Sequence, residues 1–215
     1  MVPYRRALSA AVGLAAVVLA AGSIANVSLC GWLVPESRAQ AAEQPPTTSA
    51  EQPQGEAQTF ANKVGEIRAD SIWAMSVLVL PMKGSYDQHP AAIMKLVTYA
   101  GPKGIMRSMP FGIYYDDPAK IPADSLHWDI CVPVAADAQA EAPFEVRTLP
   151  AMFAAEVVCT GPYEGTAVCY AALAEWIEKN GYVVSGPCQE HWLGDPTTMP
   201  SEKLESRIIF PVSKK

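Results

Sequence analysis

Apolar residues alternate with polar ones in two successive stretches of the chain that follow the same plan. In the later stretch, the apolar run Ala154 to Cys159 predicts a strand. The spacing of apolar residues from Thr166 to Lys179 predicts a helix that ends at Asn180-Gly181. Three further strands are predicted after it, over residues 182–184, 188–193 and 204–212.

The earlier stretch predicts the same order of elements. A strand is expected over Trp73 to Leu80 and a helix over Pro90 to Tyr99. Further strands are expected over residues 105–109, 112–115 and 126–134. Glu66 to Arg68 and Glu145 to Arg147 suggest that each stretch opens with a short strand. Runs of strands with one main helix each indicate an α+β fold, in which two helices lie on one face of a curved antiparallel sheet.

Matched residues indicate that the two stretches are copies of one unit. Three pairs of prolines are each 78 residues apart: Pro118 and Pro196, Pro122 and Pro200, and Pro133 and Pro211. We interpret this as a tandem pseudo-symmetric repeat of strand-helix-strand-strand units, over about 64–134 and 145–212, with a central cleft between the copies. Gly112 in the first copy aligns with Glu190 in the second.

The N-terminal region predicts export. Residues 1–36 begin with Arg5-Arg6 and continue as an apolar run, which is typical of a signal peptide or of a membrane anchor of about 20 residues. Ala39-Gln40-Ala41 fits a cleavage site. Residues 37–59 are rich in Pro and Gln and predict a disordered linker. The expected location of the domain at 60–215 is therefore outside the cytoplasm, either tethered to the cell membrane or secreted or periplasmic after cleavage.

Charge and cysteine content narrow the function classes. The net charge is −6 and no basic cluster occurs, so nucleic acid is not an expected partner. No zinc spacing, phosphate-binding loop or nucleophile elbow is present, and no cofactor is expected. Four cysteines fall in the domain: Cys131, Cys159, Cys169 and Cys188. Export would permit disulfides, but we interpret these residues as small apolar core residues.

One carboxylate stands out among the candidate binding residues. If residues 188–193 form a strand, Glu190 and Trp192 point to the same face. Facing the cleft, Glu190 would lie among Trp192, Tyr114, Tyr163 and Trp73. A carboxylate in apolar surroundings is unfavourable while unpaired, and a cationic ligand with aromatic contacts removes that penalty. The alternative interpretation is that Glu190 is a solvated residue on an exposed sheet face.

Several motifs resemble the GyrI-like small-molecule-binding family, which also supplies the effector-binding domain of AraC-type and MerR-type regulators. The resemblance covers roughly Val64 to Val212 and is stronger in the second copy. It is carried by Glu145-Val146-Arg147-Thr148-Leu149-Pro150, Gly161-Pro162-Tyr163-Glu164, Trp176-Ile177-Glu178-Lys179-Asn180-Gly181-Tyr182, Gly186-Pro187 and Glu190-His191-Trp192-Leu193-Gly194-Asp195-Pro196.

The resemblance implies two strand-helix-strand-strand repeats around a cleft, with Glu190 as the ligand carboxylate. The expected partner is a hydrophobic, cationic or aromatic small molecule, and non-catalytic binding is favoured. A hydrolase that uses Glu190 as a general base against an electrophile is the first alternative. Haem or tetrapyrrole binding, with His191 as the only clear axial ligand, and a structural domain without a ligand are the others. The chain shows no helix-turn-helix region, so a transcription factor is not expected.

Overall fold

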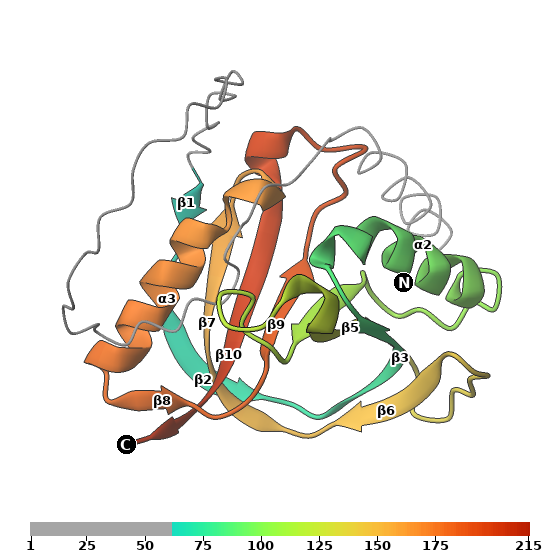
Figure 1. Cartoon of the computed structure of the whole chain (residues 1–215), viewed down its shortest axis with the longest axis horizontal. Coiled ribbons are helices and arrows are strands. Elements are labelled where there is room, and N and C mark those ends of the chain that lie inside the picture. The colour runs from blue at the N-terminus through green and yellow to red at the C-terminus, as the bar shows by residue number, and fades with distance from the viewer. Residues whose placement is uncertain (1–61) are drawn as a thin grey trace, which may run out of the picture.

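One curved, open antiparallel sheet forms the body of the protein, and two α-helices pack on it (Figure 1). The computed structural model describes residues 62–215. The helices are α2 (His89–Ala100) and α3 (Ala167–Lys179). The strands of the first half are β1 (Lys63–Val64), β2 (Arg68–Ile72), β3 (Met75–Lys83), β4 (Phe111–Tyr114) and β5 (His127–Pro133). Those of the second half are β6 (Glu145–Leu149), β7 (Met152–Thr160), β8 (Tyr182–Val184), β9 (Cys188–Trp192) and β10 (Glu205–Lys214).

The two halves of the chain meet at the centre of the sheet. The strand order is β1-β7-β10-β9-β4-β5-β3-β6, with β2 also paired to β7 and β8 to β10. The seam between the halves is therefore the β4–β9 pair. The halves also exchange strands, because β1 and β2 of the first half pair with β7, and β6 of the second half pairs with β3. This exchange holds the two halves in one sheet.

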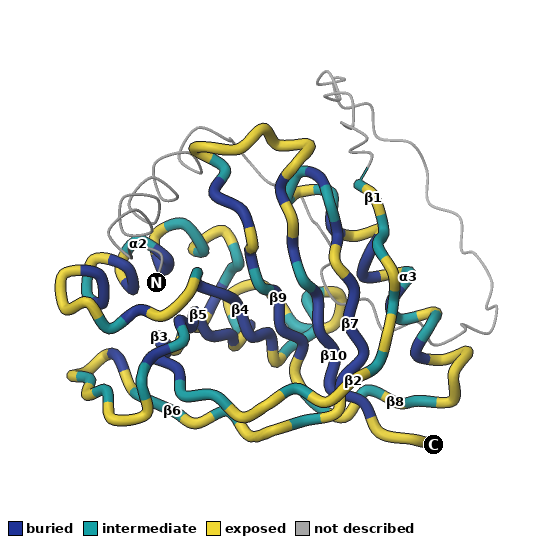
Figure 2. Tube along the Cα trace, turned by 180° about the vertical axis from the view of Figure 1, so that it is seen from behind, coloured by how far each residue is buried: buried dark blue, intermediate teal, exposed yellow. Residues whose placement is uncertain are grey.

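Both helices cover the same face of the sheet, on either side of the seam. Residues of α2 form one core cluster with β3 and β5, and residues of α3 form another with β7 and β10. Trp192 of β9 belongs to the first cluster and Cys188 to the second. Because residues four apart on a strand share a face, α2 and α3 lie on the same side. Figure 2 shows the central strands as the buried part of the tube, while β6 and β8 are more exposed.

Equivalent backbone hydrogen bonds fix the turn before each helix. Gly84 N–H donates to Leu126 O at 2.8 Å, and Gly161 N–H donates to Leu204 O at 2.8 Å. Both glycines have a positive φ, 107° and 134°, which residues with a side chain rarely adopt. Each is followed by a short 3-10 turn, η2 (Tyr86–Gln88) or η4 (Tyr163–Gly165), that leads toward the helix. The glycines thus set the direction in which both helices return over the sheet.

The α+β class, the curved antiparallel sheet and the two helices agree with the sequence prediction, but the predicted strand over 105–109 is wrong. This segment is irregular, and Met106 within it is only 4% exposed in the first core cluster. Its backbone contact with the sheet runs from Arg107 N–H to Pro133 O. The apolar residues here fill the core beside α2, and a short apolar run does not by itself distinguish that role from a strand.

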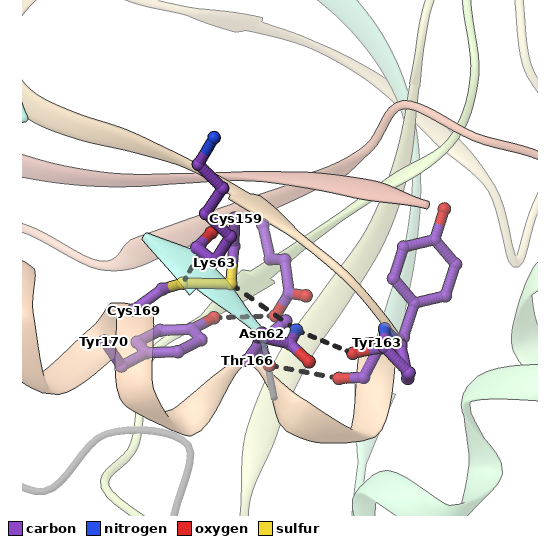
Figure 3. Close-up of a disulfide and its surroundings, with 9 residues drawn as sticks. Asn62, Lys63, Cys159, Tyr163, Thr166, Cys169 and Tyr170 are labelled. Carbon is purple, nitrogen blue, oxygen red and sulfur yellow. Dashed lines mark hydrogen bonds between the residues drawn. A yellow bond between two sulfur atoms is a disulfide. The ribbon is translucent and has the colours of Figure 1, made fainter. Parts of the chain in front are cut away.

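The prediction that the cysteines are unbonded is wrong for one pair. Cys159 near the end of β7 is joined to Cys169 in the first turns of α3, with the two Cα atoms 5.9 Å apart (Figure 3). The turn between them folds the helix back over the strand, which brings the pair within disulfide range. Cys131 and Cys188 are buried thiols, as expected.

The predicted export segment at 1–36 and linker at 37–59 lie outside the described residues. Among residues 62–215, no helix combines the length and the apolar character needed to cross a bilayer.

The disulfide closes a short loop, so its removal should lower stability by a limited amount. For a sequence separation of 10 residues, loop-closure entropy gives about 2–3 kcal/mol. We expect Cys159→Ala/Cys169→Ala to lower the free energy of unfolding by about this amount, measured by urea denaturation. A reductant such as TCEP should lower the stability of the wild type and leave the double variant unchanged. Equal sensitivity of both proteins would contradict this role.

Candidate functional site

Glu190 lies at the centre of β9, directly at the seam. Its register partner on β4 is Gly112. Glu190 shares the helix-facing side of β9 with Cys188 and Trp192, as the alternation predicted. The residue is only 4% exposed, so the alternative of a solvated residue on an open sheet face is wrong. The Glu190 side chain is therefore buried at the seam.

The surroundings of Glu190 favour its neutral form. The Tyr170 hydroxyl of α3 donates a hydrogen bond to Glu190 Oε2 at 2.7 Å. Burial raises the pKa of Glu190, and this effect exceeds the opposing influence of the Tyr170, Ser206 and Trp192 side chains. The carboxyl group thus has polar neighbours, and within residues 62–215 no cationic side chain forms an ion pair with it. Burial raises the pKa of an acid in such surroundings.

Gly112 makes room for an aromatic ring beside this carboxyl group. A Cβ atom at position 112 would lie 2.5 Å from the hydroxyl oxygen of Tyr114, closer than real contacts allow. The Tyr114 ring is therefore folded across Gly112, the residue that faces Glu190 over the ladder. Tyr114 is 4% exposed, and its hydroxyl lies 3.1 Å from His89 Nε2.

His89, the first residue of α2, is surrounded by aromatic rings. Its ring centroid lies 4.3 Å from that of Trp128, and the rings of Tyr86, Tyr114 and Trp192 are within 5.5 to 6.1 Å. The Tyr86 carbonyl accepts from Nδ1, which leaves Nε2 to accept the Tyr114 proton. Burial lowers the pKa of His89 to about 4. The imidazole is therefore neutral at pH 7.

Trp192 and Tyr163 complete the predicted group, whereas Trp73 lies apart from it. Trp192 is 9% exposed and packs in the first core cluster, where the partly buried Tyr163 contacts it. The Tyr163 hydroxyl donates to Gly194 O at 2.7 Å, and burial raises the pKa of Tyr163 to about 12. The negative charge of Glu190 also raises the pKa of Tyr163. Trp73 is 84% exposed in the connection between β2 and β3.

His191 points away from Glu190, as predicted. Its ring stacks on Phe111 on the opposite face of the sheet, with centroids 4.1 Å apart. Among residues 62–215, no group of three histidine, cysteine or acidic side chains is arranged to hold a metal ion.

Sequence reasoning missed Tyr170, His89 and Trp128. Tyr170 is on the buried face of α3 with Leu173 and Ile177, a helical spacing that the sequence does contain. His89 had no comparable signal, because its contacts with Tyr114 and Trp192 depend on how α2 docks.

A comparison with known protein families assigns the described domain. Residues 66–213 match the family described as "GyrI-like small molecule binding domain". The chain belongs to this family. A DNA gyrase inhibitor from Erwinia billingiae (strain Eb661) is 28% identical over 130 residues, which are 58% of this chain and 82% of the relative. The described domain is thus a GyrI-like domain, and Glu190 and its aromatic neighbours lie at the junction of its two halves.

Solved structures show the same fold. The EcmrR C-terminal domain has a TM-score of 0.58 at 21% identity, over 70% of this chain and 98% of that domain. EcmrR in its complex with DNA has a TM-score of 0.61 at 20% identity and 70% coverage of this chain, which spans 58% of that protein. A hydrolase from Listeria innocua has a TM-score of 0.53 at 13% identity, over 69% of this chain and 92% of that chain. The fold of this GyrI-like domain is therefore shared by EcmrR and by a protein described as a hydrolase.

Because burial raises the pKa of Glu190 above the usual 4.5, the carboxyl group should reduce stability as the pH rises above that value. We expect Glu190→Gln to gain stability relative to the wild type on going from pH 4 to pH 8, by up to about 1.4 kcal/mol per pH unit. Urea denaturation at several pH values measures this. Glu164→Gln, at an exposed position in η4, is the control. Parallel pH profiles for wild type and Glu190→Gln would contradict the argument.

The pH dependence of stability that we expect from His89 has the opposite sign. Its folded pKa of about 4 lies below the ordinary 6.5, so its stabilising effect is complete above pH 6.5 and is lost as the pH falls toward 4. The loss can reach about 3 kcal/mol. His191, whose pKa burial also lowers to about 4, should contribute separately. We expect His89→Gln and His191→Gln each to flatten the acid limb of the stability profile, and the double variant to flatten it further.

Proposed function

We propose that this chain is an exported or membrane-tethered GyrI-like protein that binds a hydrophobic, cationic or aromatic small molecule between its two halves. The observation that carries the proposal is the burial of Glu190 at the seam among Trp192, Tyr114 and Tyr163. A carboxyl group buried without a compensating cation destabilises the empty protein. A bound cation would lower the pKa of Glu190 and pair with the ionised form.

Aromatic residues around Glu190 support a flat or bulky ligand. Trp192 lies on the same face of β9 as Glu190, and the Tyr114 ring lies over Gly112, the register partner of Glu190. An aromatic ring whose face meets a bound cation attracts it by about 0.5–2 kcal/mol. Tyr86, His89 and Tyr163 are only partly buried. We propose that the ligand reaches Glu190 from this side, between the beginnings of α2 and α3.

The two halves are best explained as duplicated copies of one unit. The matched bonds of Gly84 and Gly161 support this, as do those of Arg107 to Pro133 and Ser185 to Pro211. In this interpretation β4 and β9 are equivalent strands, and Gly112 and Glu190 are equivalent positions that meet at the seam. The binding site would then lie on the axis that relates the copies.

The export proposal is based on the N-terminal sequence, which begins with Arg5-Arg6 and a long apolar run. The Cys159–Cys169 disulfide is consistent with it, because such bonds persist in oxidising spaces. In that setting the domain would capture its ligand outside the cytoplasm.

Binding should stabilise the folded protein by mass action. A ligand at 100 times its Kd adds about 2.7 kcal/mol, which raises the Tm by several degrees. We expect rhodamine 6G, an aromatic cation, to raise the Tm of the full-length protein in mild detergent, and the anion fluorescein to have no effect. The shift should be much smaller in Glu190→Gln. It should grow as the pH rises, because a cation pairs with the ionised form of Glu190 and burial raises the pKa of this carboxyl group.

Glu178→Gln controls for general loss of negative charge, because it removes an exposed carboxylate near the C-terminal end of α3, away from the proposed entry. If a broad set of aromatic cations leaves the wild-type Tm unchanged, the proposed function is wrong.

A second candidate is hydrolysis of an electrophile, with Glu190 as the general base for water. The raised pKa of Glu190 favours it, because a stronger base accepts a proton from water more readily. The architecture is also shared with a hydrolase from Listeria innocua. Repeated turnover of an aromatic ester or halide that disappears in Glu190→Gln would favour this candidate. Consumption of no more than one equivalent would exclude it.

A further inference from the structure

One end of the domain carries a patch of exposed apolar residues. Two connections, from β2 to β3 and from β6 to β7, pass each other there, because paired residues of the sheet bound both of them. Neither the stretch from Ser71 to Met75 nor that from Leu149 to Phe153 contains a charged residue. Trp73 is 84% exposed and Phe153 is 42% exposed. The apolar patch consists of five exposed residues: Trp73, Ala74, Pro150, Ala151 and Phe153.

Aromatic and basic side chains of β8 and β10 extend the apolar patch. The centroids of the Phe153 and Tyr182 rings are 5.9 Å apart. Lys214 pairs with Tyr182 in the sheet, and its Nζ lies 6.0 Å from the centroid of that ring. The backbone N–H of Lys215 donates to Gly181 O, which places the second lysine beside the same strand. Large aromatic rings and two exposed ammonium groups therefore lie at one end of the domain.

This combination of side chains is typical of a surface that contacts a lipid bilayer. Aromatic side chains such as Trp and Tyr favour the level of the lipid headgroups, where one part of the ring is apolar and the other is hydrated. Lysines beside them are attracted to anionic headgroups. A contiguous apolar patch on a soluble domain generally marks an interaction site, whereas single exposed apolar residues do not.

We propose that the apolar patch is a membrane-docking surface that rests on the bilayer in which the chain is anchored. This proposal rests on the tethered form of the proposed function and goes beyond ligand binding. The rings of Trp73 and Phe153 enter the headgroup region, and Lys214 and Lys215 pair with anionic lipid headgroups.

The predicted linker is long enough for this orientation. About 25 residues separate the predicted anchor from Asn62, and a flexible linker of that length spans about 25–30 Å on average. The linker joins β1, which pairs with the Thr160 end of β7, and the apolar patch lies at the Met152 end (Figure 1). The nine residues of β7 separate these ends by about 30 Å. Docking turns the start of α3, which follows Thr160, away from the bilayer, so the proposed ligand entry stays open.

The fluorescence of Trp73 tests the proposal. Its emission is the difference between the spectra of the wild type and Trp73→Tyr, because the other tryptophans contribute to both. We use the full-length protein in liposomes of phosphatidylcholine and phosphatidylglycerol. Brominated acyl chains should quench most of the Trp73 emission, and aqueous iodide should quench little of it. Lys214→Glu/Lys215→Glu should reduce the quenching by bromine, and more so when phosphatidylglycerol is present. Circular dichroism checks that the variants fold.

Leu193→Trp in the Trp73→Tyr background is the matched control. Leu193 is 48% exposed, and its N–H donates to Glu205 O, at the Thr160 end of the sheet. This new tryptophan should remain open to iodide and unaffected by bromine.

Three results overturn the docking proposal and leave ligand binding intact, because the Tm shift with rhodamine 6G is measured without a bilayer. The first is iodide quenching of Trp73, and the second is bromine quenching at both positions. The third is shielding of Trp73 from both quenchers, which indicates contact with another protein molecule. A full-length protein that does not float with the liposomes overturns both the docking and the tether.

Discussion

The burial of one carboxyl group at the junction of the two halves is the constraint around which the rest of the site is arranged. Glu190 is placed there by the β4–β9 pairing, where the strands of the first half of the domain meet those of the second half. Its hydrogen-bond donor, Tyr170, comes from α3, and the disulfide next to it ties that helix to β7 (Figure 3). The stability of the sheet and the geometry of the site therefore depend on the same contacts.

The difference between Gly112 and Glu190 has a physical reason. The ladder sets these positions face to face, so two glutamates here would put like charges directly opposite each other in a buried place. A glycine avoids that repulsion. It also leaves the space that the Tyr114 ring occupies, which lets the first half contribute a hydroxyl group where the second contributes an acid. The seam is therefore asymmetric, with an acid on one side and a glycine covered by an aromatic ring on the other.

The sequence was sufficient for the parts of the fold that depend on local periodicity. Alternation along residues 188–193 placed Glu190 and Trp192 on one face and His191 on the other, and the strand agrees. Trp73 was predicted both as the start of a strand and as a neighbour of Glu190. The strand begins at Met75 instead, and Trp73 is exposed in the connection before it. The contacts of His89 and the Cys159–Cys169 bond arise from the docking of helices on the sheet. The spacing of residues along the sequence does not show how a helix packs on a sheet. The His89 contacts and the disulfide could therefore not be predicted.

The site also shows how a binding function and fold stability oppose each other in this domain. The raised pKa of Glu190 and the lowered pKa of His89 have the same main cause, because the folded protein excludes water from both groups and thereby disfavours their charged forms. Glu190 therefore lowers the stability of the fold as the pH rises, and His89 lowers it as the pH falls. We expect interactions that offset this loss of folding stability to lie close to the site. The Cys159–Cys169 disulfide is one of them, because it attaches α3, the helix that supplies Tyr170, to β7. It does this without adding a charge or a side chain at the seam.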